Sequence, residues 1–283
     1  MITVERAGAL TTVQDRGRTG LAHLGVPRAG PLDRPAATLA NRLVGNGPDA
    51  ALLEVTWGGL ELTSDAGVWV AVTGAPMRVG VDGVERGCDR AEWVPAGGRL
   101  RLGPPTTGVR SYVAFAGGID VAPVLGSRST DTLAWVGPPR VEDGTTLPVG
   151  TPGDPPAPLD TPRPPLPGPL RVTPGPRADW FAPDALDRLC ASPYAVGESS
   201  NRVGLRLEGE PPARVRDDEL PSEGMVLGAV QVPPGGGPVV LLADHPSTGG
   251  YPVLAVVHPD DLWQCGQARP GEQLRLVRAP RGA

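Results

Sequence analysis

The chain has 283 residues and a formal net charge of −5. This acidic balance argues against a nucleic-acid-binding surface, and no apolar run approaches the roughly 18 residues that cross a membrane. The chain contains no lysine, which excludes a P-loop, a pyridoxal phosphate Schiff base and the active-site lysine of protein kinases.

Short apolar runs separated by turn residues predict a mainly β protein. The chain has 40 glycines and 36 prolines, and these fall between the apolar runs. Within residues 79–84, Asp82 and Gly83 predict the turn of a hairpin. The other expected strands, in chain order, are residues 68–72, 100–102, 112–115, 239–242, 253–257 and 274–277.

Two helices are expected. Asp33 can cap the first one, and Pro35 fits its first turn because an N–H is not needed there. Apolar residues then follow helical spacing up to residue 44, and Gly45 can end the helix in a left-handed conformation. A shorter helix is predicted at residues 184–190.

A proline-rich stretch divides the chain. Proline lacks a backbone N–H, so residues 151–170 suit neither a central strand nor the interior of a helix. We therefore expect an N-terminal β lobe at 1–150, a linker at 151–170 and a C-terminal β lobe at 171–283.

Sequence motifs for metal binding and for common catalytic sites are absent. The three cysteines, Cys88, Cys190 and Cys265, are far apart and form no C-x-x-C pair, which argues against a disulfide framework and a zinc site. H-E-x-x-H, G-x-S-x-G and the dinucleotide-binding glycine motif do not occur. We expect no metal. Residues 1–6 lack the apolar core of a signal peptide, so we expect a cytoplasmic protein.

Two polar clusters occur in the N-terminal part. Residues 14–18, which include Gln14, Asp15 and Arg18, precede His23 and combine groups that suit a carboxylate or amide ligand. Residues 126–131 place hydroxyls and an arginine after a glycine, and backbone N–H groups in such a run can wrap an anion. The alternatives are a solvated surface loop for the first cluster and a self-satisfied tight loop for the second.

Two further clusters lie in the C-terminal part. Asn201, Arg202 and Gln231 stand beside expected strands, where they could also serve as turn formers. Residues 244–252 follow the strand at 239–242 with carboxylate, imidazole, hydroxyl and phenol groups and paired glycines. A strand that ends in such residues is typical of a ligand site, because the strand fixes the position and glycine lets a ligand approach the backbone.

In this order the clusters resemble the carboxyltransferase-like family that includes allophanate hydrolase subunit 2, the C-type component of 5-oxoprolinase and KipA. The resemblance spans about residues 4–277. The matching motifs are VQDRGR at 13–18, GPLD at 30–33, ANRLVGN at 40–46, LEVT at 53–56, VTGA at 72–75, GGID at 117–120, GSRST at 126–130, NRVGLRL at 201–207, GAVQVP at 228–233, TGGYP at 248–252 and QARPG at 267–271.

The resemblance implies a cyclophilin-like β-barrel architecture in two lobes with a few short helices. It implies one component of a hetero-oligomeric, ATP-dependent 5-oxoprolinase that opens the 5-oxoproline lactam to L-glutamate. The implied partners are a KipI-like, B-type component and an A-type component. ATP is used by the complex, and without lysine this chain carries no covalent biotin. Pro246 and Ser247 stand where the family has Gln and Thr before TGGYP. Any contact that this Gln makes with the substrate is therefore lost here, so the substrate can differ from that of the family.

The chemistry of the matched residues gives an expected site. Proton transfer is expected from Asp15, His23 and Asp244, and Asp244→Asn is expected to abolish turnover while the complex still assembles. Substrate binding is expected from Gln14, Arg18, Ser127, Arg128, Ser129, Thr130, Asn201, Arg202, Gln231, Thr248, Gly249, Gly250 and Tyr251.

Three alternatives remain open. The chain could be half of a biotin-dependent carboxyltransferase that acts on urea or another amide, which would require a biotin carrier protein. It could be a non-enzymatic, KipA-like protein that binds a kinase inhibitor of the KipI type. It could also be a bare scaffold, in which point changes in the polar clusters would leave activity untouched.

Overall fold

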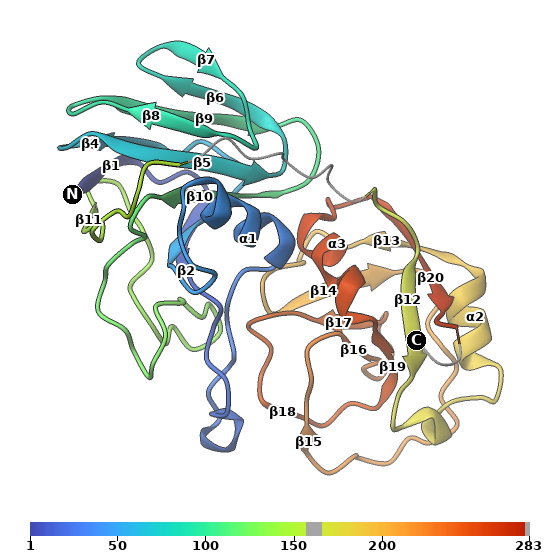
Figure 1. Ribbon diagram of the computed structural model, residues 1–283. Helices are drawn as coiled ribbons and strands as arrows, with labels where there is room; N and C mark the ends of the chain where they lie inside the picture. Colours follow the sequence, from blue (N-terminus) through green and yellow to red (C-terminus); the bar gives the residue numbers. More distant parts are fainter. Residues whose placement is uncertain (157–165, 281–283) are drawn as a thin grey trace. The chain divides into compact units, whose positions relative to one another are not determined.

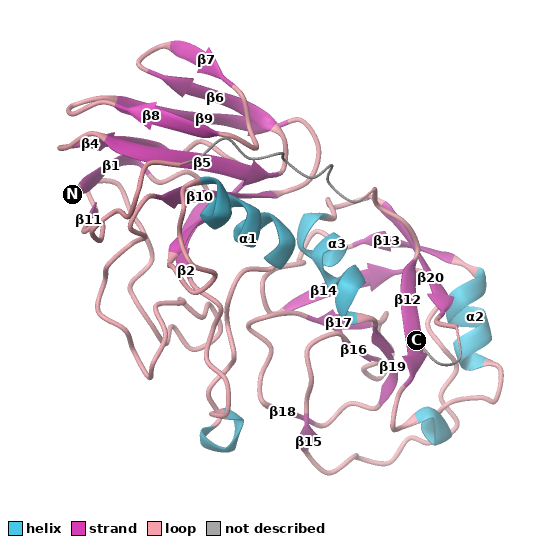
Figure 2. Ribbon diagram, viewed as in Figure 1, coloured by secondary structure: helices cyan, strands magenta, loops and turns pink. Residues whose placement is uncertain are grey.

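The computed structural model describes residues 1–156 and 166–280, and the chain divides into two compact units. The first unit is Met1–Arg18 with Ala29–Pro164, and the second is Thr19–Arg28 with Pro165–Ala283. The linker predicted at 151–170 lies partly outside the described residues. Figure 2 shows that strands predominate over helices in both units, which confirms the mainly β prediction.

The first unit contains two antiparallel sheets. The six-stranded sheet has the order β11–β1–β4–β9–β6–β7 and the five-stranded sheet the order β2–β3–β10–β5–β8. The strands of the first sheet are Ile2–Arg6 (β1), Glu61–Ser64 (β4), Met77–Val81 (β6), Val84–Arg86 (β7), Arg99–Pro105 (β9) and Thr146–Leu147 (β11). Those of the second are Leu10–Gln14 (β2), Leu52–Thr56 (β3), Val68–Gly74 (β5), Ala91–Val94 (β8) and Arg110–Phe115 (β10).

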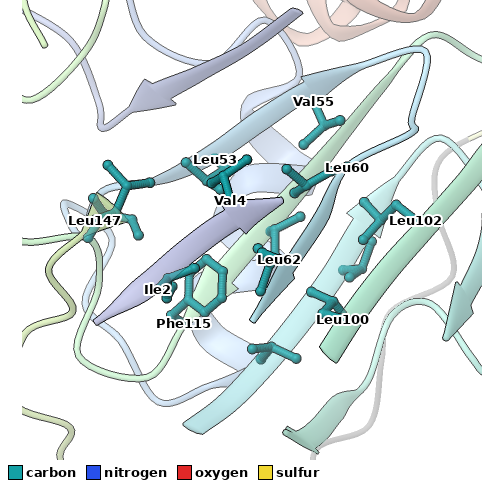
Figure 3. Packing of buried hydrophobic residues seen from close by; sticks show 14 of the residues in the cluster. Ile2, Val4, Leu53, Val55, Leu60, Leu62, Leu100, Leu102, Phe115 and Leu147 are labelled. Carbon is teal, nitrogen blue, oxygen red and sulfur yellow. The ribbon is translucent and has the colours of Figure 1, made fainter. Parts of the chain in front are cut away.

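A shared apolar core joins the two sheets (Figure 3). Apolar residues of β1, β4 and β9 pack in it with residues of β3, β5 and β10. Strand β10 is buried along its whole length: Val113 and Phe115 belong to this core, while Tyr112 and Ala114 belong to a second cluster with the helix α1. Because successive strand residues face opposite sides, β10 is covered on both of its faces.

Helix α1, Arg34–Leu43, contacts β5 and β10 of the five-stranded sheet (Figure 1). The Asp33 carboxylate accepts a hydrogen bond from the Ala36 N–H at 3.0 Å, and Gly45 has a φ of 76°, so both predicted helix ends are confirmed. The predicted hairpin is β6–β7, and its turn residues Asp82 and Gly83 have φ values of 48° and 78°. Left-handed conformations at both positions are those of a type I′ turn.

The second unit is built on a closed barrel with the order β12–β19–β16–β17–β14–β13–β20. A parallel pair, β12 with β20, completes the ring, so each strand of the barrel is paired on both sides. The barrel strands are Leu170–Pro174 (β12), Pro193–Val196 (β13), Gly204–Glu208 (β14), Ala229–Gln231 (β16), Val239–Leu241 (β17), Val253–Val257 (β19) and Gln273–Arg278 (β20).

The second unit also contains short strands and helices outside the barrel. A two-stranded ribbon pairs β15 with β18, and α2 confirms the helix predicted at 184–190. No helix among the described residues is long and apolar enough to cross a membrane. The bounds of these elements are Glu223–Gly224 (β15), Thr248–Gly249 (β18), Ala185–Ala191 (α2), Leu262–Gln267 (α3) and the 3₁₀ helices Ala22–Leu24 (η1), Ala178–Trp180 (η2) and Pro259–Asp261 (η3).

Candidate functional site

In the first unit, Asp15 joins the end of β2 to the loop at residues 127–129. Its Oδ1 atom lies 2.5 Å from the Ser127 Oγ and 2.7 Å from the Ser129 Oγ, and it accepts a hydrogen bond from the Gly17 N–H at 2.9 Å. The other carboxylate oxygen accepts from the Arg128 N–H at 2.6 Å. The structure therefore brings together the two N-terminal clusters, and one carboxylate holds them.

These contacts fix the ionisation of Asp15. Burial by itself would raise the pKa of Asp15, but the hydrogen bonds from Ser127, Arg128, Ser129 and Gly17 outweigh burial and lower that pKa. A carboxylate that is stabilised in its charged form by four donors is a weak base. The geometry gives Asp15 a clear role in holding the loop, and its predicted part in proton transfer gains no support from it.

The two arginines of these clusters are engaged by neighbouring protein groups. Arg18 is buried, and its guanidinium donates to the carbonyl oxygens of Val124 and Ser129 at 3.0 and 2.6 Å. Arg128 donates to the Asp120 carboxylate and to the Val121 carbonyl oxygen, both at 2.7 Å. Arg18 therefore ties the loop at 121–129 to the segment after β2, and Arg128 closes the loop on its own start.

Gln14 and Thr130 are also held by hydrogen bonds inside the first unit. The buried Gln14 amide donates to the Thr12 hydroxyl and the Thr130 carbonyl oxygen, each at 2.9 Å, and accepts from the Gly30 N–H at 3.1 Å. The Thr130 hydroxyl donates to the Pro138 carbonyl oxygen at 2.9 Å. Both side chains fix the loops next to β2.

A buried network that was not predicted from the sequence positions the segment before α1. The Tyr112 hydroxyl donates to the Glu54 carboxylate at 2.9 Å and accepts from the Asp33 N–H at 2.7 Å. The same carboxylate accepts from the Leu32 N–H at 3.0 Å and pairs with Arg110. Glu54 stands among apolar strand residues in the sequence, and a carboxylate there is the signal that could have pointed to this network.

The end of β2, the segment before α1, one face of that helix and the loop before β3 line an open cavity of about 150 Å³. The Arg16 guanidinium and the Asp49 carboxylate form an ion pair of 3.1 Å among the lining residues. The lining residues are Gln14, Asp15, Arg16, Pro31, Arg34, Ala37, Thr38, Asn41, Pro48, Asp49, Ala50 and Leu52. The cavity contains two of the predicted site residues, Gln14 and Asp15.

In the second unit, Arg202 and Asp244 form a buried, bidentate ion pair. The Arg202 Nε and Nη2 atoms lie 2.8 and 2.9 Å from the two carboxylate oxygens of Asp244, and both side chains are at most 1% exposed. The pair links the segment before β14 to the segment after β17. The structure therefore brings two of the predicted residues together, but the guanidinium and the carboxylate bind each other and not a ligand.

Gln231 connects the barrel to the segment at residues 248–251. Its buried amide donates to the Tyr251 carbonyl oxygen and lies beside the Met225 sulfur, at 3.1 Å in each case. Thr248 and Gly249 form β18 of the two-stranded ribbon, and a Cβ at Gly249 would lie 2.8 Å from the Gln231 amide nitrogen. Glycine at this position thus permits the close approach.

Several of the predicted residues lie at the surface of the second unit. The Tyr251 ring is half exposed, and the exposed His23 has its Nδ1 atom 3.0 Å from the Gly20 carbonyl oxygen. The Asn201 side chain accepts from the N–H groups of Val203 and Gly204, which is the geometry of a turn. Gly250 lies close to the backbone of a neighbouring segment: an added Cβ would be in tight contact with the Leu220 carbonyl oxygen, at 3.2 Å.

His245 lies in the cluster at residues 244–252, and the sequence assigned it no role. Its Nδ1 lies 2.7 Å from the Pro246 carbonyl oxygen, and the side chain is 7% exposed. Burial lowers the pKa of His245, and it outweighs the hydrogen bond to Pro246 and the Asp244 charge, which raise that pKa. A neutral ring whose Nδ1 donates to a carbonyl carries its lone pair on Nε2, which is then the nitrogen that can accept a proton.

Among residues 1–156 and 166–280 there is no group of three or more His, Cys, Asp or Glu side chains that could hold a metal ion. Of the predicted site residues, Arg18, Arg128 and Arg202 are engaged by protein groups, so the described geometry does not give them a ligand.

A family model and two known proteins each match most of the chain. The model of the carboxyltransferase domain, subdomains A and B, matches residues 24–278. The chain is 39% identical to the C subunit of 5-oxoprolinase from Escherichia coli, over 98% of this chain and 91% of that protein. It is 33% identical to urea amidolyase of Saccharomyces cerevisiae, covering 98% of this chain and 16% of that protein.

Solved structures with the same fold are longer than this chain. The structure of TTHA0988 superposes with a TM-score of 0.88 and 41% identity, covering 98% of this chain and 55% of that one. Urea amidolyase of K. lactis superposes with a TM-score of 0.90 and 31% identity, covering 99% of this chain and 19% of that one. The fold described here is thus a part of larger chains in both proteins.

Proposed function

The chain belongs to the carboxyltransferase family of subdomains A and B, and from this membership we propose that it is the C-type component of a cytoplasmic, ATP-dependent 5-oxoprolinase. The observation that carries the proposal is the 39% identity to the E. coli protein of that name over 91% of its length. The partners are a KipI-like, B-type component and an A-type component. The reaction opens the 5-oxoproline lactam to L-glutamate.

The chemistry explains why ATP is needed. An amide is stabilised by resonance, so water attacks a lactam carbonyl only slowly. Transfer of the ATP γ-phosphoryl group to the lactam oxygen gives a better electrophile. Water then adds to the ring carbon, the ring C–N bond breaks, and phosphate and glutamate are released. ATP is not held by a P-loop of this chain, because the chain lacks the required lysine.

The first test is glutamate release from 5-oxoproline and ATP by this chain mixed with its A-type and B-type partners. We expect turnover only when all three proteins are present, with glutamate and phosphate formed in equal amounts. Each protein is then omitted in turn. Full turnover without this chain, or no turnover from a stable complex, would contradict the proposal.

A second candidate, carboxyl transfer to urea or a related amide, is favoured by the urea amidolyase relatives at 33% identity. That activity needs carboxybiotin on a separate carrier, since this chain has no lysine to carry biotin. Avidin distinguishes the two functions. It would stop carboxyl transfer by capturing biotin, and it would leave the opening of the lactam unchanged.

We propose His245 as the proton-transfer group in the second unit. The Asp244 carboxylate is bound by Arg202 through two hydrogen bonds, so its oxygens are poorly placed to accept a proton from water. The neighbouring His245 has its lone pair on Nε2, and the hydrogen bond from Nδ1 to the Pro246 carbonyl oxygen orients the ring. This nitrogen can accept the proton of the attacking water or return one to the leaving amine.

His245→Asn should keep the fold and lose about 100-fold or more of the turnover rate of the complex. The asparagine amide can replace Nδ1 in the hydrogen bond to Pro246, but it has no atom at the position of Nε2. His245→Gln should lose as much activity, because its amide can form a hydrogen bond near that position but cannot accept a proton. The measurement is kcat for glutamate release as a function of pH.

The matched control is His258→Asn. His258 accepts the Asp260 N–H at the start of η3, and asparagine can make the same cap. This variant should keep the wild-type rate. Equal rates for the two asparagine variants would remove His245 from proton transfer.

A further inference from the structure

The cavity of the first unit has a small volume and mixed walls. About 150 Å³ accommodates a ring of five or six atoms, since an engineered cavity of this size in another protein binds benzene. Part of its wall is apolar, formed by Pro31, Ala37, Pro48 and Leu52. Such a pocket, which is open to solvent on one side, has room for a compact ring against its apolar wall.

The polar groups of the wall fall into two kinds. Gln14 and Asn41 are buried, and their amides are engaged by protein atoms: the Asn41 Nδ2 donates to the Ala50 carbonyl oxygen at 2.9 Å, and its Oδ1 accepts from Asn46 at 3.0 Å. These amides therefore form a fixed wall. Arg16 and Arg34 carry charge and are solvent accessible, so they can adjust to a ligand.

The wall carries two arginines and two aspartates, and one of its positive charges, on Arg34, has no carboxylate beside it among the residues that the structure describes. The Asp15 carboxylate is occupied by its four donors, and Asp49 pairs with Arg16. Within the described parts of the chain, Arg34 has no carboxylate partner within ion-pair distance and stands at the start of α1. A guanidinium in this setting can bind a carboxylate through two hydrogen bonds.

The Arg16–Asp49 ion pair is part of the cavity lining, and a ligand could break it easily. Its two side chains are 66% and 56% exposed, and ion pairs as exposed as this contribute little to stability. A ligand carboxylate could take the place of the Asp49 carboxylate on Arg16 at small cost. Asp49 thus competes with an anionic ligand and also repels it.

We propose that this cavity binds a small ring-bearing monocarboxylate, with Arg34 and Arg16 as the carboxylate-binding side chains and Asp49 as an internal competitor. Naming the acid as 5-oxoproline rests on the proposed function, because that lactam has one ring and one carboxylate. The binding of a monocarboxylate itself follows from the volume and charges of the cavity.

The test is titration calorimetry of the full chain with 5-oxoproline and with cyclopentanecarboxylate. We expect saturable binding of at least one of the two acids at one site per chain. Arg34→Gln should weaken that binding about tenfold or more, because it removes a charge-assisted pair of hydrogen bonds. Asp49→Asn should strengthen it about threefold or more, because it removes a competing and repelling carboxylate.

Arg42→Gln is the matched control. Arg42 is exposed in the last turn of the same helix and does not line the cavity, so this variant should bind as the wild type does. Equal losses from the two arginine variants would show unspecific attraction of anions and overturn the proposal. Weaker binding by Asp49→Asn, or no binding by the wild type, would also overturn it.

Binding and turnover fail independently in this design. Binding of cyclopentanecarboxylate that follows the expected order of variants, without lactam hydrolysis by the mixture of the three proteins, would keep the site and reject the proposed function. Hydrolysis by the mixture without binding of either acid to this chain would reject the site and keep the function.

Discussion

Asp244→Asn should destabilise the second unit by about 3–5 kcal/mol, the usual cost of removing one partner of a buried ion pair. Arg202 is 1% exposed, and its charge would be left buried opposite a neutral amide. The expected result is a large fall in the free energy of unfolding, measured by urea denaturation. Lost turnover in this variant would therefore report a damaged barrel, contrary to the sequence-based expectation that assembly stays intact.

A double variant separates stability from chemistry. Arg202→Met with Asp244→Leu replaces the pair by apolar side chains of similar size, and such replacements are often neutral or stabilising. We expect the double variant to regain most of the stability lost in Asp244→Asn. If it does, and turnover stays absent, the pair has a role in the reaction. A single Asp244→Asn variant as stable as the wild type would refute the structural role.

Asp15→Asn should destabilise the first unit by about 3 kcal/mol, because several hydrogen bonds to a charged acceptor are lost or weakened. The asparagine NH2 group would face the Gly17 N–H or the Arg128 N–H, and a backbone N–H can only donate. The control is Asp120→Asn, whose exposed carboxylate meets one arginine and should cost far less. Equal effects of the two variants in urea denaturation would contradict the central role of Asp15.

The Asp15 contribution also depends on pH in a defined direction. The pKa of Asp15 is lower in the folded protein than in the unfolded chain, despite burial, because of its four hydrogen bonds. The stabilisation is therefore fully present above the unfolded pKa of about 3.9 and is lost as the pH falls through the folded value. The stability difference between wild type and Asp15→Asn should be constant from about pH 7 to 5 and shrink below about pH 4. A difference that grows on acidification would have the wrong sign.

Local patterns were read correctly where local forces decide the structure. Asp33 and Gly45 mark the ends of α1, and Asp82 with Gly83 marks the turn of β6–β7, because capping and left-handed turns depend on neighbouring residues in the chain. Strands β5, β10 and β19 were predicted from continuous apolar runs. These strands are largely buried, so their sequences carry a strong signal.

Other elements were not predicted because their sequences are mixed. Strands β2 and β3 contain Thr12, Gln14 and Glu54, which are buried with hydrogen-bonded side chains. From the sequence alone, a polar residue in a strand is predicted to be exposed, because its hydrogen-bond partner in the folded protein is not known. For Glu54, the partners Tyr112 and Arg110 come from β10, more than fifty residues away in the chain.

The sequence by itself determined the mainly β class, the turn and cap positions, the family and the clusters of polar residues. All of these depend on residue types and on short spacings along the chain. Only the tertiary structure decided what the clustered residues do: Asp15 accepts hydrogen bonds from a loop more than a hundred residues away, and Asp244 meets Arg202 beside the paired strands β14 and β17. The reason is physical, since a buried charge is governed by the groups that surround it in space, and sequence distance does not specify them.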